Sequence, residues 1–199
     1  MADSQRRPGV PLLLLDVDGV LNALGRQPED FRAWAEWRTG SARAAGTDWP
    51  ITFAPEVPQR LGSLHASGLV EVQWLTTWGH EANGSLRGLL GLPELDVAGT
   101  YDDEPGEGQE RPEDTDALAG STPSAPDLLE GSWWKHDVVR KVMHREPGRR
   151  LVWVDDELTA DSPFMAWTDA QAHLQALGPN PLSGLTPADL ATIERWAST

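Results

Sequence analysis

With 199 residues, the chain is long enough for one well-buried core, and we expect a single domain over residues 1–199. It has no cysteine, which excludes disulfides and thiolate chemistry, and its net charge of −15 comes with no basic stripe for a nucleic-acid backbone. No apolar run is long enough to span a membrane and residues 1–9 are polar, so we expect a cytoplasmic protein with no membrane partner.

Predicted strands and helices alternate along the first part of the chain. Residues 12–16 form an apolar run that ends in an acid, which predicts a buried strand. We expect a helix over residues 29–45, whose large apolar side chains are spaced for one helical face, and a loop or short edge structure over the proline-rich residues 46–58. A helix over 59–67 and a strand over 69–75 follow.

The middle of the chain holds the least regular segment. A helix is expected over residues 81–90, closed by Gly91, and a short strand over 95–97. Residues 99–132 are acidic, rich in Pro, Gly, Ser and Thr, and poor in large apolar side chains. That composition predicts a long flexible acidic loop.

The last third returns to the alternating pattern. We predict a helix over residues 135–145, a strand over 151–155 and an edge strand over 172–177. A final helix begins after Thr186, a typical N-cap, with Pro187 in its first turn. Strands that are apolar throughout are typical of parallel sheets buried on both faces, so the fold class is α/β with a mainly parallel sheet flanked by helices.

Acidic pairs end two of the predicted strands. Asp16 and Asp18 follow the first strand, with Gly19 allowing a sharp turn, and Asp155 and Asp156 follow a later one. Each pair alone is also common in ordinary solvated turns. If both meet at one sheet edge, like charges ~4 Å apart repel by roughly 4 kcal/mol at an effective dielectric near 20, so a cation is needed, and Mg²⁺ suits oxygen ligands.

A hydroxyl pair and a lysine complete the candidate site. Thr76 and Thr77 directly follow the predicted strand over residues 69–75, where they could bind phosphate or merely cap the following helix. Lys135 begins a helix and could hold a phosphate oxygen, although an exposed surface lysine is the ordinary alternative.

In this order, the motifs resemble the four-motif pattern of the haloacid dehalogenase (HAD) superfamily of phosphatases and phosphotransferases. The resemblance rests on Asp16-Val17-Asp18-Gly19-Val20, Thr76, Lys135 and Asp155-Asp156. It implies a single doubly wound, Rossmann-like domain with a small flap or helical insert after the first strand. Asp18 distinguishes phosphatases from members that cleave carbon–halogen bonds, which lack that second acid.

The resemblance also implies a role for each residue. Asp16 would be the nucleophile, and Asp18 the acid that protonates the leaving oxygen and then activates water. Thr76, Thr77 and Lys135 would bind the phosphate. Mg²⁺ would be held by Asp16, the backbone carbonyl of Asp18, Asp155 and Asp156, the last directly or through water.

Little sequence is left to cover such a site. Residues 24–58 suffice for a flap or minimal cap, and the acidic loop cannot build a cap core. An open site suits a large substrate or one closed over by a second subunit of a homo-oligomer. Trp78, Trp133 and Trp134 could stack on a substrate ring or simply pack in the core, and His80 could contact substrate or lie on the surface.

The sequence thus predicts a Mg²⁺-dependent phosphohydrolase that cleaves a phosphomonoester of a small molecule through an aspartyl-phosphate. One alternative is a phosphatase that processes nucleic-acid ends; the acidic charge argues against a nucleic-acid partner, whereas arginines near the flap, among them Arg26 and Arg43, argue for one. Another is a phosphate-binding regulatory module without turnover. A response-regulator receiver domain fits poorly, because its phosphorylated Asp lies in mid-chain before the Thr.

Overall fold

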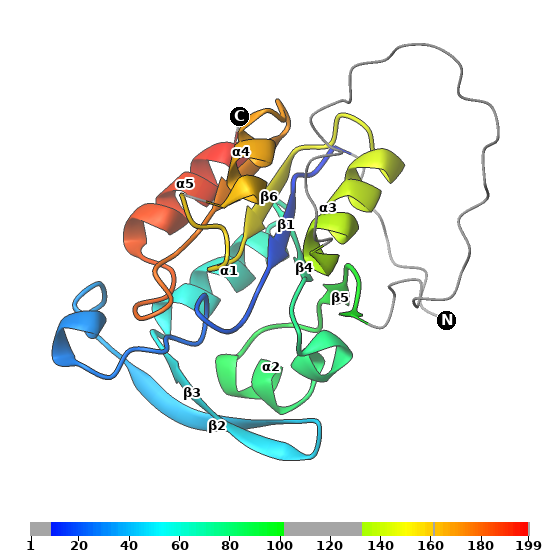
Figure 1. The fold of residues 1–199 in the computed structure, drawn as a ribbon. Helices are drawn as coiled ribbons and strands as arrows, with labels where there is room; N and C mark the ends of the chain where they lie inside the picture. The colour runs from blue at the N-terminus through cyan, green and yellow to red at the C-terminus, as the bar shows by residue number, and fades with distance from the viewer. Residues whose placement is uncertain (1–8, 102–132, 161, 199) are drawn as a thin grey trace, which may run out of the picture.

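A parallel five-stranded sheet forms the centre of the computed structural model, which describes residues 9–101, 133–160 and 162–198. The strand order is β5-β4-β1-β6-β7, and every pairing in it is parallel (Figure 1). The strands are β1 (Leu12–Leu15), β4 (Glu71–Trp74), β5 (Asp96–Val97), β6 (Leu151–Val154) and β7 (Leu174–Leu177).

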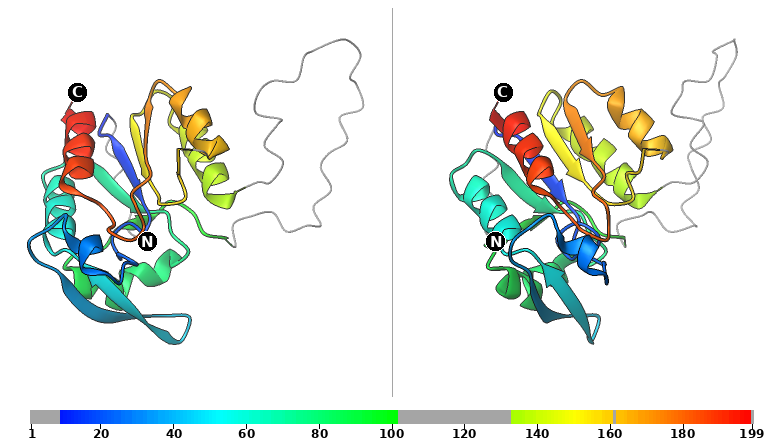
Figure 2. Two further views of the ribbon diagram at one scale, coloured as in Figure 1. Left: turned by 60° about the vertical axis from the view of Figure 1, so that its left-hand side comes forward. Right: turned by 90° about the vertical axis from the view of Figure 1, so that its left-hand side faces the viewer.

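Helices cover both faces of this sheet. Figure 2 shows α1 (Glu56–Ala66) and α5 (Pro187–Ser198) on one face, and α3 (Trp134–Arg145) and α4 (Pro163–Asp169) on the other. This is the doubly wound α/β architecture that the sequence predicted. Within the described residues, no helix is long and apolar enough to cross a bilayer.

The side chains of β1 divide the core into two layers. Leu13 and Leu15 pack in the cluster that includes α1 and α5, whereas Leu12 and Leu14 pack against α3 and its neighbours. All four leucines are essentially inaccessible to solvent. The period-two alternation of a strand explains why β1 must be apolar at every position: both of its faces are buried.

The strands expected at residues 12–16, 69–75, 95–97, 151–155 and 172–177 are confirmed, with bounds shifted by a residue or two. The final helix is confirmed as well, and Thr186 and Asp189 bond reciprocally at its start. The expected helix over residues 81–90 is instead split at Gly84 into η2 (Gly79–Asn83) and α2 (Ser85–Leu90). Most of the predicted acidic loop, residues 102–132, lies outside the described residues.

The helix predicted over residues 29–45 is wrong. Only η1 (Pro28–Phe31), a turn of 3₁₀ helix, falls in its first part, residues 32–37 are irregular, and β2 (Arg38–Ala44) pairs with β3 (Thr47–Phe53) in a hairpin. The second strand also occupies most of the segment predicted as loop or edge structure. Ala42 and Ala44 are buried two residues apart, as a strand requires, and Ala45 and Gly46 make the turn with positive φ.

The hairpin lies beyond the carboxyl end of β1, next to α2 (Figure 1). Contact with α2 is close: a Cβ added at Gly40 would lie 2.7 Å from Leu89 Cδ1, so no larger residue fits there without a shift. Where the sequence predicted a flap or helical insert after the first strand, the structure has a two-stranded ribbon beside the edge where the candidate site residues are found.

Candidate active site

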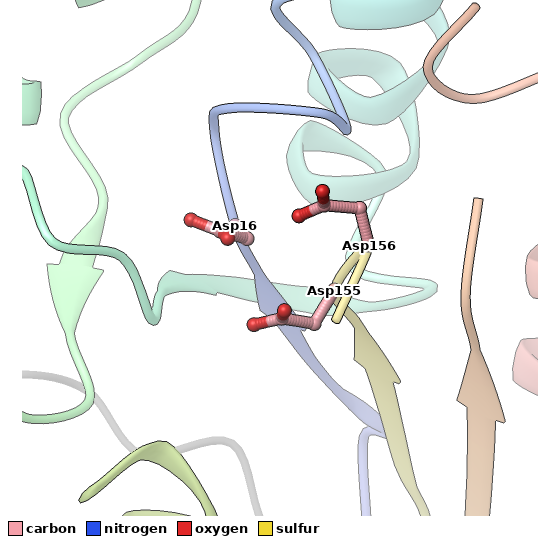
Figure 3. Close-up of side chains that lie close together, drawn as sticks. All are labelled: Asp16, Asp155 and Asp156. Carbon is pink, nitrogen blue, oxygen red and sulfur yellow. The ribbon is translucent and has the colours of Figure 1, made fainter. Parts of the chain in front are cut away.

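Three carboxylates meet where β1 and β6 end side by side. Asp16 follows β1, Asp155 and Asp156 follow β6, and one oxygen from each lies within 4.8 Å of the others (Figure 3). Asp155 is completely buried and Asp16 is 5 % exposed. Because β1 and β6 are adjacent parallel strands, their residues emerge at the same sheet edge, which is why acids so distant in sequence converge.

The ammonium of Lys135 bridges two of these acids. Its Nζ donates to Asp16 Oδ2 at 2.6 Å and to Asp155 Oδ2 at 2.7 Å, and the residue is 3 % exposed. Burial lowers the pKa of Lys135, but attraction to the two carboxylates outweighs that effect, so its pKa lies above the ordinary value. The lysine is therefore a permanent cation inside the site and not the exposed surface residue of the alternative interpretation.

The single positive charge of Lys135 does not balance the negative charges of the three carboxylates. Burial, with repulsion from Asp16, raises the pKa of Asp155 from 3.8 to about 7, although Lys135 opposes the increase. The pKa of Asp156 rises to about 6, chiefly through burial and again through Asp16. Excess negative charge on converging oxygen donors fits a divalent cation such as Mg²⁺, which prefers carboxylate ligands.

The lack of a side chain at Gly19 leaves room for the carboxylate of Asp156. The φ of Gly19 is +70°, and a Cβ at this position would lie 2.4 Å from Asp156 Cγ and Oδ2. A side chain here would thus be both strained in the left-handed region and in collision with a carboxylate. Position 19 therefore requires a glycine, because the carboxylate of Asp156 is packed against it.

The carboxylate of Asp18 lies outside the group of three and has its own partners. Its Oδ1 accepts from Asn22 Nδ2 at 2.8 Å, and its Oδ2 accepts from Trp78 Nε1 at 2.8 Å. Asn22 also accepts from the backbone N–H of Thr52 in β3 at 2.9 Å, so it joins the acid to the hairpin. The side chain of Asp18 thus points at Asn22 and Trp78 and is not one of the three converging carboxylates.

Sequence reasoning gave no role to Asn22, and it left open whether Trp78 stacks on a substrate or packs in the core, where the structure places it. Trp78 is 8 % exposed and points its N–H at Asp18, where a stacking role had been considered. A polar residue four positions after Asp18, in the turn that leaves β1, was the available signal for Asn22. The isolated bridge between Asp18 and Asn22 shows that this turn folds back on itself.

The remaining predicted residues are the two threonines after β4 and the residues Trp133, Trp134 and His80, whose roles the sequence left open. Thr76 follows β4, next to β1, and is 1 % exposed; its Oγ1 accepts from Trp78 N at 3.4 Å. Thr77 is exposed. Trp133 packs on Trp153 with ring centroids 4.9 Å apart, so it belongs to the core. The other two residues that the sequence left open are Trp134, also in that core, and His80, which is exposed in η2.

A central strand followed by Asp-x-Asp-Gly, a lysine from a helix and an aspartate pair on the neighbouring strand define a HAD-type domain. The family model described as "HAD domain in Swiss Army Knife RNA repair proteins" matches residues 12–190, and the chain belongs to this family. The resemblance to the HAD superfamily is thereby confirmed, and HAD domains are generally phosphatases or other hydrolases. A search of curated proteins found no match.

Proposed function

We propose that this chain is a Mg²⁺-dependent phosphohydrolase that cleaves a phosphomonoester through an aspartyl-phosphate on Asp16. The observation that carries the proposal is the buried contact of Lys135 with both Asp16 and Asp155, while Asp18 is held apart by Asn22 and Trp78. Two acids only two positions apart in the sequence thus have different surroundings, as a nucleophile and a separate proton carrier require.

In the first step, a carboxylate oxygen of Asp16 attacks phosphorus and the bond from phosphorus to the leaving oxygen breaks. Asp18 gives its proton to that oxygen. In the second step water attacks phosphorus and gives a proton to Asp18, and the bond to Asp16 breaks to release inorganic phosphate. Lys135 balances charge throughout, and the hydroxyl of Thr76 donates to a phosphoryl oxygen.

Mg²⁺ would be held by Asp16, Asp155 and Asp156, with the backbone carbonyl of Asp18. When bound, it would neutralise charge on the phosphoryl oxygens. The protein's own residues supply the rest: Gly19 leaves the space that the Asp156 carboxylate occupies, and the ammonium of Lys135 pairs with Asp16 and Asp155.

Two substrate classes follow from different observations. The net charge of −15 and the acids at the site favour a small phosphorylated molecule. The description of the family favours a second candidate, the phosphorylated end of a nucleic acid. For the second candidate, exposed arginines of β2, Arg38 and Arg43, already pair with Glu36 and Asp48, which leaves less positive charge for a phosphate backbone.

The test compares phosphate release from phosphorylated metabolites and from 5′- and 3′-phosphorylated oligonucleotides, with Mg²⁺ or with EDTA. Asp16→Asn should abolish turnover, whereas Asp169→Asn, on the exposed end of α4, should not change it. Asp18→Asn should slow hydrolysis of the intermediate, so that mass spectrometry finds a phosphoryl group on the peptide that contains Asp16. An Asp16→Asn protein as active as the wild type contradicts the mechanism, and binding without turnover by the wild type indicates a regulatory module.

A further inference from the structure

A cavity of about 490 Å³ opens beside Asp18, between the hairpin and η2. Its volume lies in the range of about 300 to 1,000 Å³ that is typical of small-molecule sites. Asp18, Trp49, Trp78 and Glu81 are among the residues that line it. Since Asp18 is the proposed proton donor to the leaving oxygen, the cavity begins where the leaving group of a phosphoester has to lie.

Trp49 is an aromatic wall of this cavity. It is 49 % exposed, an unusual state for so large an apolar side chain, and it comes from β3 of the hairpin. Its Nε1 donates to the carbonyl oxygen of Ala44 at 3.3 Å, which orients the indole across the strand pair. An exposed and oriented indole is well suited to stack on a flat ring.

Side-chain anchors hold the hairpin wall in place. Glu81 Oε2 accepts from the backbone N–H of Ala45 at 2.8 Å, at the turn where Ala45 has a φ of +50°. Ser85 Oγ accepts from the N–H of Arg43 at 2.6 Å. The turn of the hairpin is thus tied to η2 and α2, and the cavity is formed before any ligand arrives, which reduces the ordering cost of binding.

The charge of the cavity selects what can enter it. Among the described residues that line it, the ionisable ones are Asp18 and Glu81, both acids, and none is a lysine or arginine. A leaving group with its own phosphate or carboxylate would meet repulsion there. The phosphoryl group would instead be attracted by Lys135 and by the cation that Asp16, Asp155 and Asp156 would hold, outside this cavity.

We infer that this cavity receives the leaving group of the phosphomonoester and that Trp49 stacks on a planar, uncharged ring of it. The inference rests on the proposed phosphohydrolase function, and it makes Trp49 a specificity-determining residue. Stacking on a tryptophan face rewards flatness, so a flat ring should be preferred over a puckered ring of similar size.

The probes are benzyl phosphate and cyclohexylmethyl phosphate, which differ mainly in the flatness of the ring. Their kcat and KM are measured with Mg²⁺ for the wild type, Trp49→Leu and Trp49→Phe. Their dissociation constants are measured by calorimetry in an Asp16→Asn background. Leu69→Ala is the matched control, since Leu69 is 48 % exposed and does not line the cavity.

We expect Trp49→Leu to weaken the binding of benzyl phosphate on the order of tenfold and to raise its KM by a similar factor. Cyclohexylmethyl phosphate should change much less, Trp49→Phe should retain most of the preference, and Leu69→Ala should match the wild type. Equal losses for both esters, or no loss for either, overturn the role of Trp49. If the wild type hydrolyses neither ester, the proposed function fails for these esters, and the binding data still decide whether the cavity selects flat rings.

Discussion

Charge on Asp155 should destabilise the metal-free protein, and replacement by asparagine tests this. The carboxyl group is completely buried, and burial with the nearby Asp16 raises its pKa from 3.8 to about 7. A pKa that is higher in the folded state means that the native protein holds the extra proton. Its stabilising contribution is complete below the unfolded pKa and is lost as the pH rises through the folded value.

The magnitude follows from the two pKa values. One pKa unit corresponds to about 1.4 kcal/mol, so the rise to about 7 amounts to about 4 kcal/mol in the free energy of unfolding. Because the loss begins near the unfolded pKa, about 3 kcal/mol of it falls between about pH 5 and pH 8. Asp156 should add a smaller loss in the same direction, since its pKa rises only to about 6.

Urea unfolding in EDTA across this pH range is the assay. Asp155→Asn keeps the shape of the side chain without its charge, so the variant should gain about 3 kcal/mol on the wild type as the pH rises. Titration of the acids that lie far from Asp155 cancels in this comparison. Saturating Mg²⁺ should reverse the ranking, because the wild type retains a ligand that the variant has lost. A difference between the two proteins that stays constant from pH 5 to pH 8 in EDTA refutes the reasoning.

Three further changes test the surroundings of the acids. Gly19→Ala should weaken Mg²⁺ binding in calorimetry, whereas Gly148→Ala, which has a similar positive φ but open space for a Cβ, should leave it unchanged; equal affinities in both variants would contradict the steric argument. Lys135→Met leaves buried carboxylates without their cation and should cost about 3 to 5 kcal/mol of unfolding free energy in EDTA, and a variant as stable as the wild type would contradict this. Trp78→Phe removes the N–H that Asp18 accepts and should lower kcat about tenfold with KM little changed, whereas an unchanged kcat would show that this hydrogen bond does not position the acid.

The arrangement of the acids was predictable because it follows from strand order in a parallel sheet. The apolar runs of β1 and β6 are buried on both faces, so each can end only where the chain leaves the sheet, and polar residues follow at that point. Asp16, Asp155 and Lys135 were located by this logic together with the resemblance. Which strands are neighbours, and hence which acids meet, came from the family pattern and not from any single motif.

The hairpin was not predictable in the same way. Its buried residues are small or few: β2 buries Ala42 and Ala44, and β3 buries Ile51 and Phe53. Alanine favours helices, and its spacing from Trp34 fitted a helical face, so local propensity pointed away from the ribbon. Pairing between β2 and β3 and contact with α2 decide the structure, and both are tertiary effects.

Asn22 connects the part that was predicted to the part that was missed. Its side chain donates to Asp18 Oδ1 and to the carbonyl oxygen of Pro50, and it accepts from Thr52 N–H, so one amide links the proposed proton donor to β3. The strand that it contacts also carries Trp49, which lines the cavity beside Asp18. We therefore expect a displacement of β3 to disturb Asn22 and, through it, the position of the Asp18 carboxylate, which would couple the hairpin to the proposed proton transfer.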